Sequence, residues 1–131
     1  MPNPAEQLRP TEIKTDEIDL SKIKDPDLVK MIMEAREPES GSKYYIAAGI
    51  AEKIGETELA KTLHQKYGEY GEKSCEDFLS GKNPEKYKYA LSEAQVAKLS
   101  YEVAGNEEGA KRMEDKMKDI GRRLKISVVK N

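Results

Sequence analysis

Two side chains that often do chemistry near neutral pH occur once each in this chain. His64 is able to act as a general base beside a carboxylate or a tyrosine. Cys75 has Glu72, Glu76 and Asp77 as near neighbours, and negative charges raise the pKa of a thiol and disfavour its reactive anion. A single Cys and a single His exclude a disulfide framework and a zinc site built from these two residue types. We therefore expect Cys75 to be inert and partly buried, and an enzyme that uses His64 with a carboxylate is the second alternative function.

Carboxylates are abundant, but they follow none of the spacings that bind metals. The chain has no Glu-x-x-His pair, no Asp-x-Asp-x-Asp-Gly loop and no glycine-rich phosphate loop. Glu56, Glu58, Glu107 and Glu108 stand where helices are expected to begin, and the helix dipole favours negative charge there. We predict no cofactor and no metal, and we expect His64 to be a half-exposed residue on the flank of a helix.

Positive charge is concentrated near the end of the chain. Residues 111–131 carry eight Lys and Arg against three Asp and Glu, although the whole chain has a net charge of -2. Such a basic helix, with tyrosines available for stacking, is one way to hold single-stranded nucleic acid. The alternative is that the cations favour the C-terminal end of a helix and pair with the acidic N-terminal segment of this chain or of a neighbouring copy. The candidate nucleic-acid contacts are Lys111, Arg112, Lys116, Lys118, Arg122, Arg123 and Lys125.

Tyrosines supply most of the aromatic residues, with seven Tyr, one Phe and no Trp. Tyr45 and Tyr89 lie off the apolar stripes of their expected helices, and aromatic residues with a polar tip are enriched at interfaces. Filling of the core boundary is the favoured explanation of the tyrosines. The alternative is that Tyr45 and Tyr89 belong to a surface that contacts a protein partner.

Length and composition indicate one helical domain. A chain of 131 residues has the usual size of a single domain, and 37% charged residues exclude a membrane span. Three prolines within the first ten residues predict a mobile, then extended, segment over 1–24 that precedes a helical domain over 25–131. No secretory signal is visible, so we expect a cytoplasmic protein, and the many Lys and Glu residues also fit a heat-adapted source.

Apolar residues at helical spacing predict five helices. Asp25-Pro26 and Asn83-Pro84 are start signals, Thr57 and Asn106 are further candidate caps, and Ser92 is a possible break. The expected ranges are about 26–37, 42–54, 57–79, 84–104 and 106–124. Alternating Ile126, Val128 and Val129 then predict an extended tail, with a short strand pairing against residues 13–23 as the alternative.

Apolar stripes and glycines show how these helices are expected to pack. Gly55 and Gly105 follow the ends of two stripes and are expected to be left-handed C-caps. Gly68 and Gly71 lie inside a helix, where each costs about 1 kcal/mol relative to Ala. Either another backbone packs closely there or the helix bends, and we expect close packing. The stripes are Tyr44, Ala47, Ala48, Ala51 and Ile54, then Leu59, Leu63, Tyr67, Tyr70, Ser74 and Phe78, then Tyr87, Leu91, Ala94, Ala97, Tyr101 and Ala104, and then Ala110, Met113, Met117, Ile120 and Leu124.

An internal repeat joins the two expected hairpins. Residues 42–73 and 92–123, which are 50 apart, are identical at nine of 32 positions without a gap. Similar composition of charged amphipathic helices is the alternative explanation, but the glycine followed by Glu, Ala and Lys at plus three, five and six favours a true repeat. The identical pairs are Ser42 and Ser92, Ala47 and Ala97, Glu52 and Glu102, Gly55 and Gly105, Glu58 and Glu108, Ala60 and Ala110, Lys61 and Lys111, Lys66 and Lys116, and Gly71 and Gly121.

The first hairpin resembles a tetratricopeptide-type helix pair at its aromatic, small, turn-glycine, second small and lysine positions. In the first copy these are Tyr44, Ala48, Gly55, Ala60 and Lys66. The second copy keeps less of the pattern: its residues Ala94, Tyr101, Gly105, Ala110 and Lys116 preserve the aromatic residue and the turn. Lys98 and Ala51 depart from the family pattern, and the 50-residue period exceeds the family's 34. The resemblance covers about half of the chain and implies stacked hairpins with a groove for peptides. A plain helical bundle remains equally compatible.

The sequence therefore predicts an all-α fold, either a helical bundle or a short stack of two antiparallel hairpins, about 42–80 and 84–124, preceded by an N-terminal helix. The expected function is a non-catalytic interaction or assembly module that binds a protein partner or a second copy of itself, away from membranes. A nucleic-acid accessory protein that uses the basic C-terminal helix is the first alternative.

Overall fold

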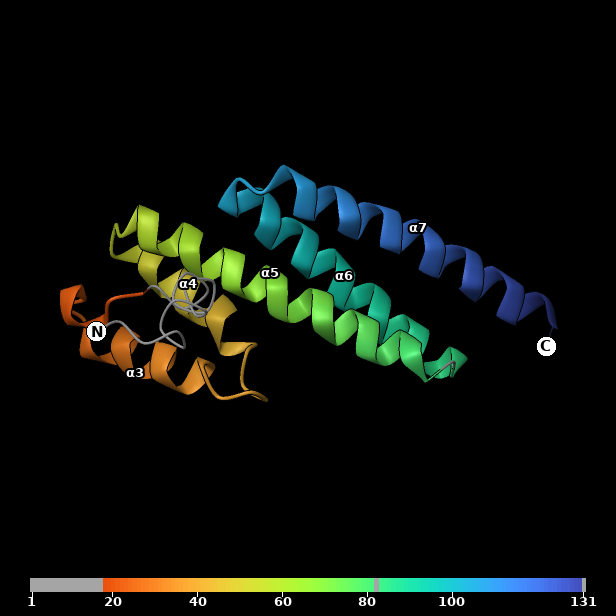
Figure 1. Ribbon diagram of the computed structural model, residues 1–131, viewed down its shortest axis with the longest axis horizontal. Coiled ribbons are helices and arrows are strands. Elements are labelled where there is room, and N and C mark those ends of the chain that lie inside the picture. Colours follow the sequence, from red (N-terminus) through yellow and green to blue (C-terminus); the bar gives the residue numbers. More distant parts are fainter. Residues whose placement is uncertain (1–17, 82, 131) are drawn as a thin grey trace, which may run out of the picture.

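The computed structural model describes residues 18–81 and 83–130, with side chains described as far as Lys125, and it is an all-α protein (Figure 1). The predicted fold class is confirmed. The elements are the 3-10 turn η1 (Leu20–Lys22) and the helices α3 (Pro26–Ala35), α4 (Lys43–Lys53), α5 (Thr57–Ser80), α6 (Pro84–Ala104) and α7 (Glu107–Lys130). The segment predicted to be mobile lies mostly outside the described residues.

Side-chain caps start the helices where the sequence places them, with one exception. The Asp25 carboxylate accepts hydrogen bonds from the backbone N–H groups of Asp27 and Leu28, and Asn83 accepts one from Glu85. Asn106 Oδ1 likewise accepts from the N–H of Gly109 at 2.9 Å. The cap predicted at Thr57 is wrong, because Thr57 is the first residue of α5 and the preceding glutamate makes no side-chain cap.

The turns after α4 and α6 have the same geometry. Gly55 and Gly105 adopt φ values of 84° and 82°, the left-handed region that glycine enters without a steric penalty. Each glycine N–H donates to the carbonyl three residues back, and the next N–H donates to the carbonyl five residues back. These paired bonds form a Schellman motif, so both predicted C-caps are confirmed and the chain reverses twice in the same way.

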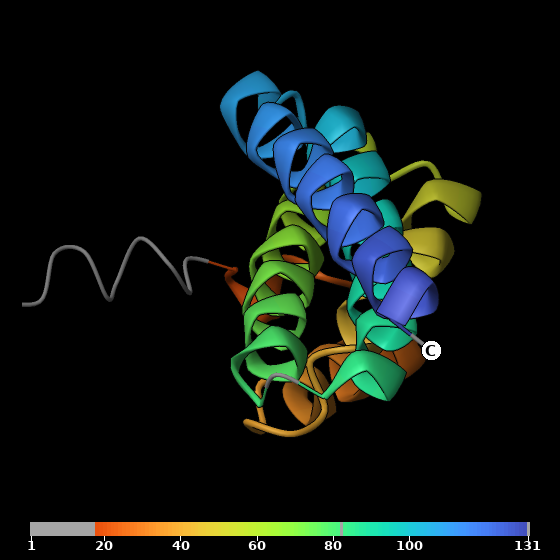
Figure 2. The same ribbon diagram turned by 90° about the vertical axis from the view of Figure 1, so that its right-hand side faces the viewer.

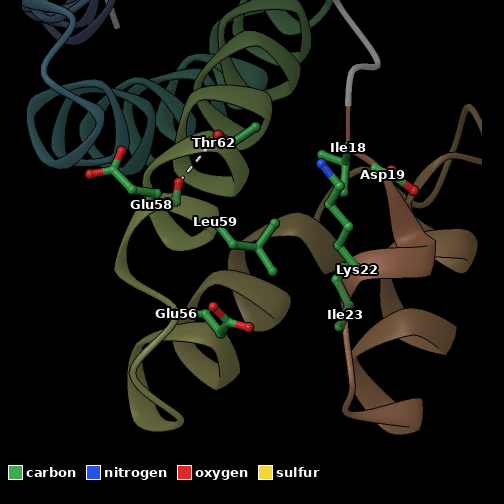
Figure 3. Close-up of a pocket in the computed structure, with 8 residues that line it drawn as sticks. All are labelled: Ile18, Asp19, Lys22, Ile23, Glu56, Glu58, Leu59 and Thr62. Atoms are coloured by element: carbon green, nitrogen blue, oxygen red, sulfur yellow. Dashed lines mark hydrogen bonds between the residues drawn. The ribbon is translucent and has the colours of Figure 1, made fainter.

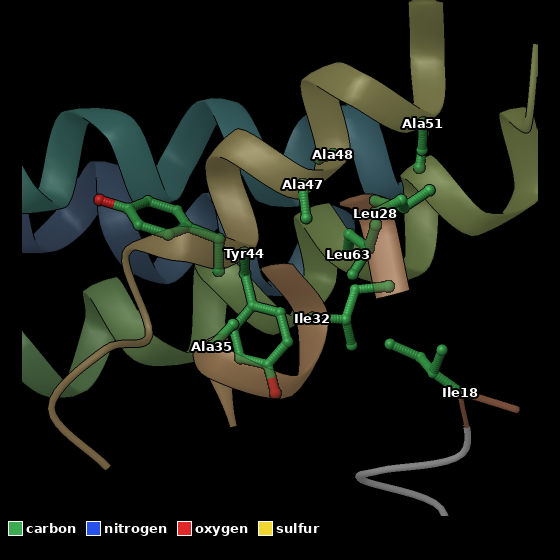
Figure 4. Close-up of a cluster of buried hydrophobic side chains, with 11 residues drawn as sticks. Ile18, Leu28, Ile32, Ala35, Tyr44, Ala47, Ala48, Ala51 and Leu63 are labelled. Carbon is green, nitrogen blue, oxygen red and sulfur yellow. The ribbon is translucent and has the colours of Figure 1, made fainter. Parts of the chain in front are cut away.

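The helices pack in chain order, so that α3 and α7 lie on opposite sides of α5 (Figure 1). Seen along the long axis, α5 and α6 run side by side and α7 crosses over them (Figure 2). One cluster of buried side chains joins α3, α4 and the first half of α5, including Leu28, Ile32 and Leu63 (Figure 4). A second cluster joins the rest of α5 to α6 and α7 around Tyr101 and Met113. α5 is therefore shared by both clusters.

Glycines allow α5, α6 and α7 to approach closely at Tyr101. This ring is almost fully buried, and a methyl group built at either Gly68 of α5 or Gly109 of α7 would lie 2.7 Å from its carbon atoms. One turn further along α5, a methyl at Gly71 would lie 3.0 Å from the Ala97 methyl. The prediction that Gly68 and Gly71 mark close packing is confirmed.

Four local predictions are wrong. Ile54 is exposed, because α4 ends before it and the left-handed glycine turns the chain away. No break occurs at Ser92, since α6 is continuous. The first helix ends at Ala35, before the residue that precedes Pro38, as the proline rule requires. The extended tail at 126–129 is helical, because extending α7 adds one hydrogen bond per residue whereas no strand within residues 18–81 or 83–130 is present to pair with it.

Candidate interaction face on α4 and α6

Helix α6 carries a second, mostly apolar stripe on a side that is largely exposed. Its members follow alternating steps of three and four residues, which keep them on one helix face. They are Tyr89, Ser92, Val96, Leu99 and Val103. The exposed fractions of Tyr89, Leu99 and Val103 are 58%, 56% and 45%. Because the opposite stripe through Ala90, Ala94, Ala97 and Tyr101 fills the core, α6 is apolar on two faces.

Helix α4 has two more exposed apolar side chains, and one of them, Tyr45, reaches α5 close to this stripe. Tyr45 and Ile46 are 47% and 52% exposed. The Tyr45 ring contacts the Tyr67 ring of α5 at a centroid distance of 5.3 Å, and Val96 of α6 packs against the same cluster that contains Tyr67. Tyr45 of α4 and Val96 of α6 therefore both lie close to Tyr67. We call the surface formed by Tyr45 and the α6 stripe the α4–α6 face.

Tyr67 forms the floor of the face between the two helices. Burial raises the pKa of its hydroxyl to about 12, and the nearby Glu93 carboxylate acts in the same direction. This hydroxyl therefore stays neutral at physiological pH.

The two tyrosines predicted to form a partner surface are both half-exposed, but they contact α5 at separate places. Tyr45 rests on Tyr67, whereas Tyr89 contacts the Phe78 ring at 5.7 Å near the other end of the helix. Lys86 lies over the outer side of Phe78, with its Nζ 6.0 Å from the ring centroid. The α6 stripe runs from Tyr89 toward Tyr45 and so connects the two positions.

His64 is not half-exposed as predicted, since only 6% of it is accessible. Its Nε2 lies 3.6 Å from Oε1 of Glu52, too far for a strong hydrogen bond, and the Tyr45 ring covers it edge-on at 5.9 Å. Neither ring nitrogen has a hydrogen-bond partner within the described part of the chain. The prediction is wrong because α4 covers the flank of α5 that carries His64. Sequence periodicity does not show which flank of a helix a neighbour covers.

Six of the seven basic residues proposed for nucleic-acid contact form ion pairs. Arg112 and Lys116 bridge α7 to carboxylates of α5, with Lys116 Nζ 2.6 Å from Glu76. Lys111, Lys118, Arg122 and Arg123 pair within α7 itself, with Asp115, Glu114 and Asp119. These six partners lie on α5 and α7. Lys125 is exposed.

Glu72 is the centre of the strongest polar cluster. It accepts two hydrogen bonds from Arg112, at 2.9 and 3.1 Å, and one from the Tyr101 hydroxyl at 2.6 Å. The Arg112 hydrogen bonds hold the pKa of the Glu72 carboxyl below its usual range, and burial together with that carboxylate raises the pKa of the Tyr101 hydroxyl. The cluster ties all three long helices together and is structural.

Cys75 is fully buried in the second cluster, deeper than predicted. Burial is the main cause that raises the pKa of its thiol to about 11, and Glu76 adds to the shift. The thiol is therefore protonated at physiological pH, which confirms the predicted direction of the pKa shift.

Three open cavities of about 370, 380 and 500 Å³ are lined by residues other than His64. One lies between η1 and the start of α5, where Leu59 and Thr62 face Lys22 and Ile23 (Figure 3). Among the residues that the structure describes, no group of three His, Cys, Asp or Glu side chains is placed to hold a metal ion. Over those residues, too, no helix has both the length and the apolar content needed to cross a bilayer.

Comparison with protein-family models, curated proteins and solved structures finds no match. The α4–α6 face therefore rests on the residues themselves. The sequence analysis names Tyr45 and Tyr89 but not Leu99 and Val103. The three- and four-residue spacing of Leu99 and Val103 is visible in the sequence. The first stripe of α6 already explains a helix with one buried face, so the second stripe is not needed to predict the helix.

Proposed function

We propose that this protein is a non-catalytic helical interaction or assembly module that binds a protein partner through the α4–α6 face. The observation that carries the proposal is the exposed stripe of α6. Surface helices of globular domains usually have one apolar face, whereas α6 has a buried face and an exposed one. An exposed apolar stripe that continues along a helix is typical of a surface that another helix covers.

Burial of the apolar side chains of this face would contribute favourably to the free energy of binding. Burial of apolar surface contributes about 25 cal/mol per Å², and aromatic residues at the centre of an interface carry a large share of the binding energy. Tyr45 and Tyr89 are held by Tyr67 and Phe78, so their rings lose less rotamer freedom on binding than free side chains do. This preorganisation favours a protein ligand over a purely solvent-exposed role.

The tetratricopeptide resemblance supports the same surface without adding a named partner. The resemblance implies a groove that holds peptides, and by the 50-residue repeat α4 and α6 are the first helices of the two hairpins. The family relationship stays a prediction.

The test is photo-crosslinking in cells with benzoylphenylalanine in place of Leu99. Met33 of α3 is the matched control, because it is also an apolar side chain exposed by 55% but lies away from the α4–α6 face. We expect a discrete crosslinked species from position 99 and none from position 33. The additional substitution Val103→Glu, on the same stripe, is expected to remove that species. Equal crosslinking at both positions, or none at position 99, overturns the proposal.

A further inference from the structure

The His64 ring is a buried titratable group in contact with Tyr45 of the α4–α6 face. Only 8% of its side chain is accessible, and neither ring nitrogen has a hydrogen-bond partner within the described part of the chain. The Tyr45 ring lies edge-on to it at 5.9 Å and also contacts the Tyr67 ring at 5.3 Å. Histidine gains a charge between pH 5 and 8, so Tyr45 rests against a group whose charge changes near neutral pH.

The charged groups around His64 come from α4, from α5 itself and from α6. On α4, Glu52 Oε1 lies 3.6 Å from Nε2, and among the described residues Glu52 holds the only carboxylate within 4 Å of the ring nitrogens. On α5, the charged side chain one turn away is Lys61, which is exposed. The last turns of α6 carry Lys98 and Glu102, which bond each other at 2.9 Å. Glu52 is therefore the group that responds directly to a charge on His64.

Protonation gives the His64 ring two N–H donors and a positive charge. Glu52 is 54% exposed, and its carboxylate needs to move only about 0.7 Å to accept a hydrogen bond from Nε2–H. Nδ1–H then has no acceptor in the described part of the chain, and an unpaired charged donor is costly to bury. This cost falls when water reaches the ring, and Tyr45 is the half-exposed ring that covers it.

We propose that His64 is a proton-operated switch for the α4–α6 face. Uptake of a proton draws Glu52 onto the ring and moves Tyr45 off its place against α5, so the face binds its partner at neutral pH and releases it in mild acid. Tyr45 and Glu52 are two turns apart on the same side of α4. Gly49 lies between them, and nothing lies within 4 Å of a methyl built there, so this side of α4 has open space. The inference rests on the proposed function and adds its regulation by pH.

Fluorine NMR of the full chain, with trifluoromethylphenylalanine in place of Tyr45, tests the switch. The label keeps an aromatic ring and has no titratable hydroxyl. The same label in place of Tyr89 is the matched control, because Tyr89 also rests on an α5 ring, that of Phe78 at 5.7 Å, but far along the helix from His64. Between pH 5 and 8 we expect the resonance at position 45 to shift with one midpoint and that at position 89 to stay constant. His64 is the only histidine, so its own Cε1–H signal must show the same midpoint.

Two substitutions separate a switch from a passive neighbour. His64→Gln keeps a polar side chain that does not titrate, so the resonance at position 45 should become constant. Glu52→Gln removes the charge that favours the imidazolium, so the midpoint should move to lower pH by roughly half a unit to one unit. This second variant keeps the test decisive if His64→Gln does not fold. A constant resonance at position 45 in the wild type, a shift that persists in His64→Gln, or an unchanged midpoint in Glu52→Gln overturns the inference.

Photo-crosslinking from position 99 in lysate at pH 7.5 and at pH 5.5 measures the regulation itself. The yield should fall roughly threefold or more at the lower pH in the wild type and stay equal in His64→Gln. Equal wild-type yields refute the switch and leave the proposed function standing. A proton response at position 45 with no crosslink from position 99 at either pH refutes the proposed function instead.

Discussion

Replacing Gly68 with alanine tests the close packing around Tyr101. The new methyl group would lie 2.7 Å from two carbons of the Tyr101 ring, at least about 0.7 Å closer than ordinary contact. The ring has little room to retreat, because the backbone of Gly109 in α7 packs so closely that a methyl built there would also lie 2.7 Å from the ring, and Glu72 holds the Tyr101 hydroxyl. Relief therefore requires α5 and α7 to move apart.

The expected size of the effect follows from two opposing contributions. Alanine in a helix interior is more favourable than glycine by about 1 kcal/mol, whereas overpacking a well-filled core costs about 1 to 3 kcal/mol. Gly68→Ala is therefore expected to change the free energy of unfolding by about 0 to 2 kcal/mol in the destabilising direction. Gly49→Ala in α4 is the matched control, because nothing lies within 4 Å of the added methyl and only the helix term remains. It is expected to stabilise by about 1 kcal/mol.

Urea denaturation followed by circular dichroism at 222 nm measures both variants against the wild type. The difference between the two glycine variants, about 1 to 3 kcal/mol, is the decisive quantity. Equal stabilisation by both variants would refute the argument that α5, α6 and α7 are locked at Tyr101.

Three further outcomes are expected. Glu72→Gln should lower the free energy of unfolding at pH 7, and this loss should shrink in acid. The pKa of Glu72 is lowered in the folded state, so its carboxylate stabilises the fold above the ordinary pKa of about 4.3, and that stabilisation is lost as the pH falls through the folded-state pKa. A loss that stays constant from pH 7 to pH 3 contradicts this. Cys75 should react with a thiol reagent at pH 8 only slowly in the folded protein and rapidly in urea, and rapid native labelling would show that it is accessible. Single-stranded DNA should retain the protein weakly at 50 mM salt, because six of the seven candidate cations are ion-paired, and strong salt-dependent retention would instead support the nucleic-acid alternative.

Much of the fold follows from local sequence signals. Asp25, Asn83 and Asn106 cap helices as expected, and Gly55 and Gly105 end them, because each such residue acts through hydrogen bonds or backbone angles within its own turn. The tail at 126–129 was misread because three alternating β-branched residues are too few to outweigh a helix that is already formed.

The candidate site was predicted only in part. Tyr45 and Tyr89 were recognised from their residue type, but Leu99 and Val103 were not, because a sequence pattern shows that a helix has two apolar stripes and not which one a neighbour covers. The predicted exposure of His64 is wrong for the opposite reason, since α4 buries a flank of α5 that periodicity assigns to solvent.

The sequence by itself determined the five helices, three of their caps and the two reversing turns, because these depend on interactions between residues close together in the chain. Only the tertiary structure decided which faces are buried. It placed Gly68 and Gly109 on either side of Tyr101, paired the cations of α7 with carboxylates, and left one apolar side of α6 open. Those outcomes depend on contacts between residues dozens of positions apart, such as Glu72 and Arg112. Local sequence patterns do not show which distant residues come into contact.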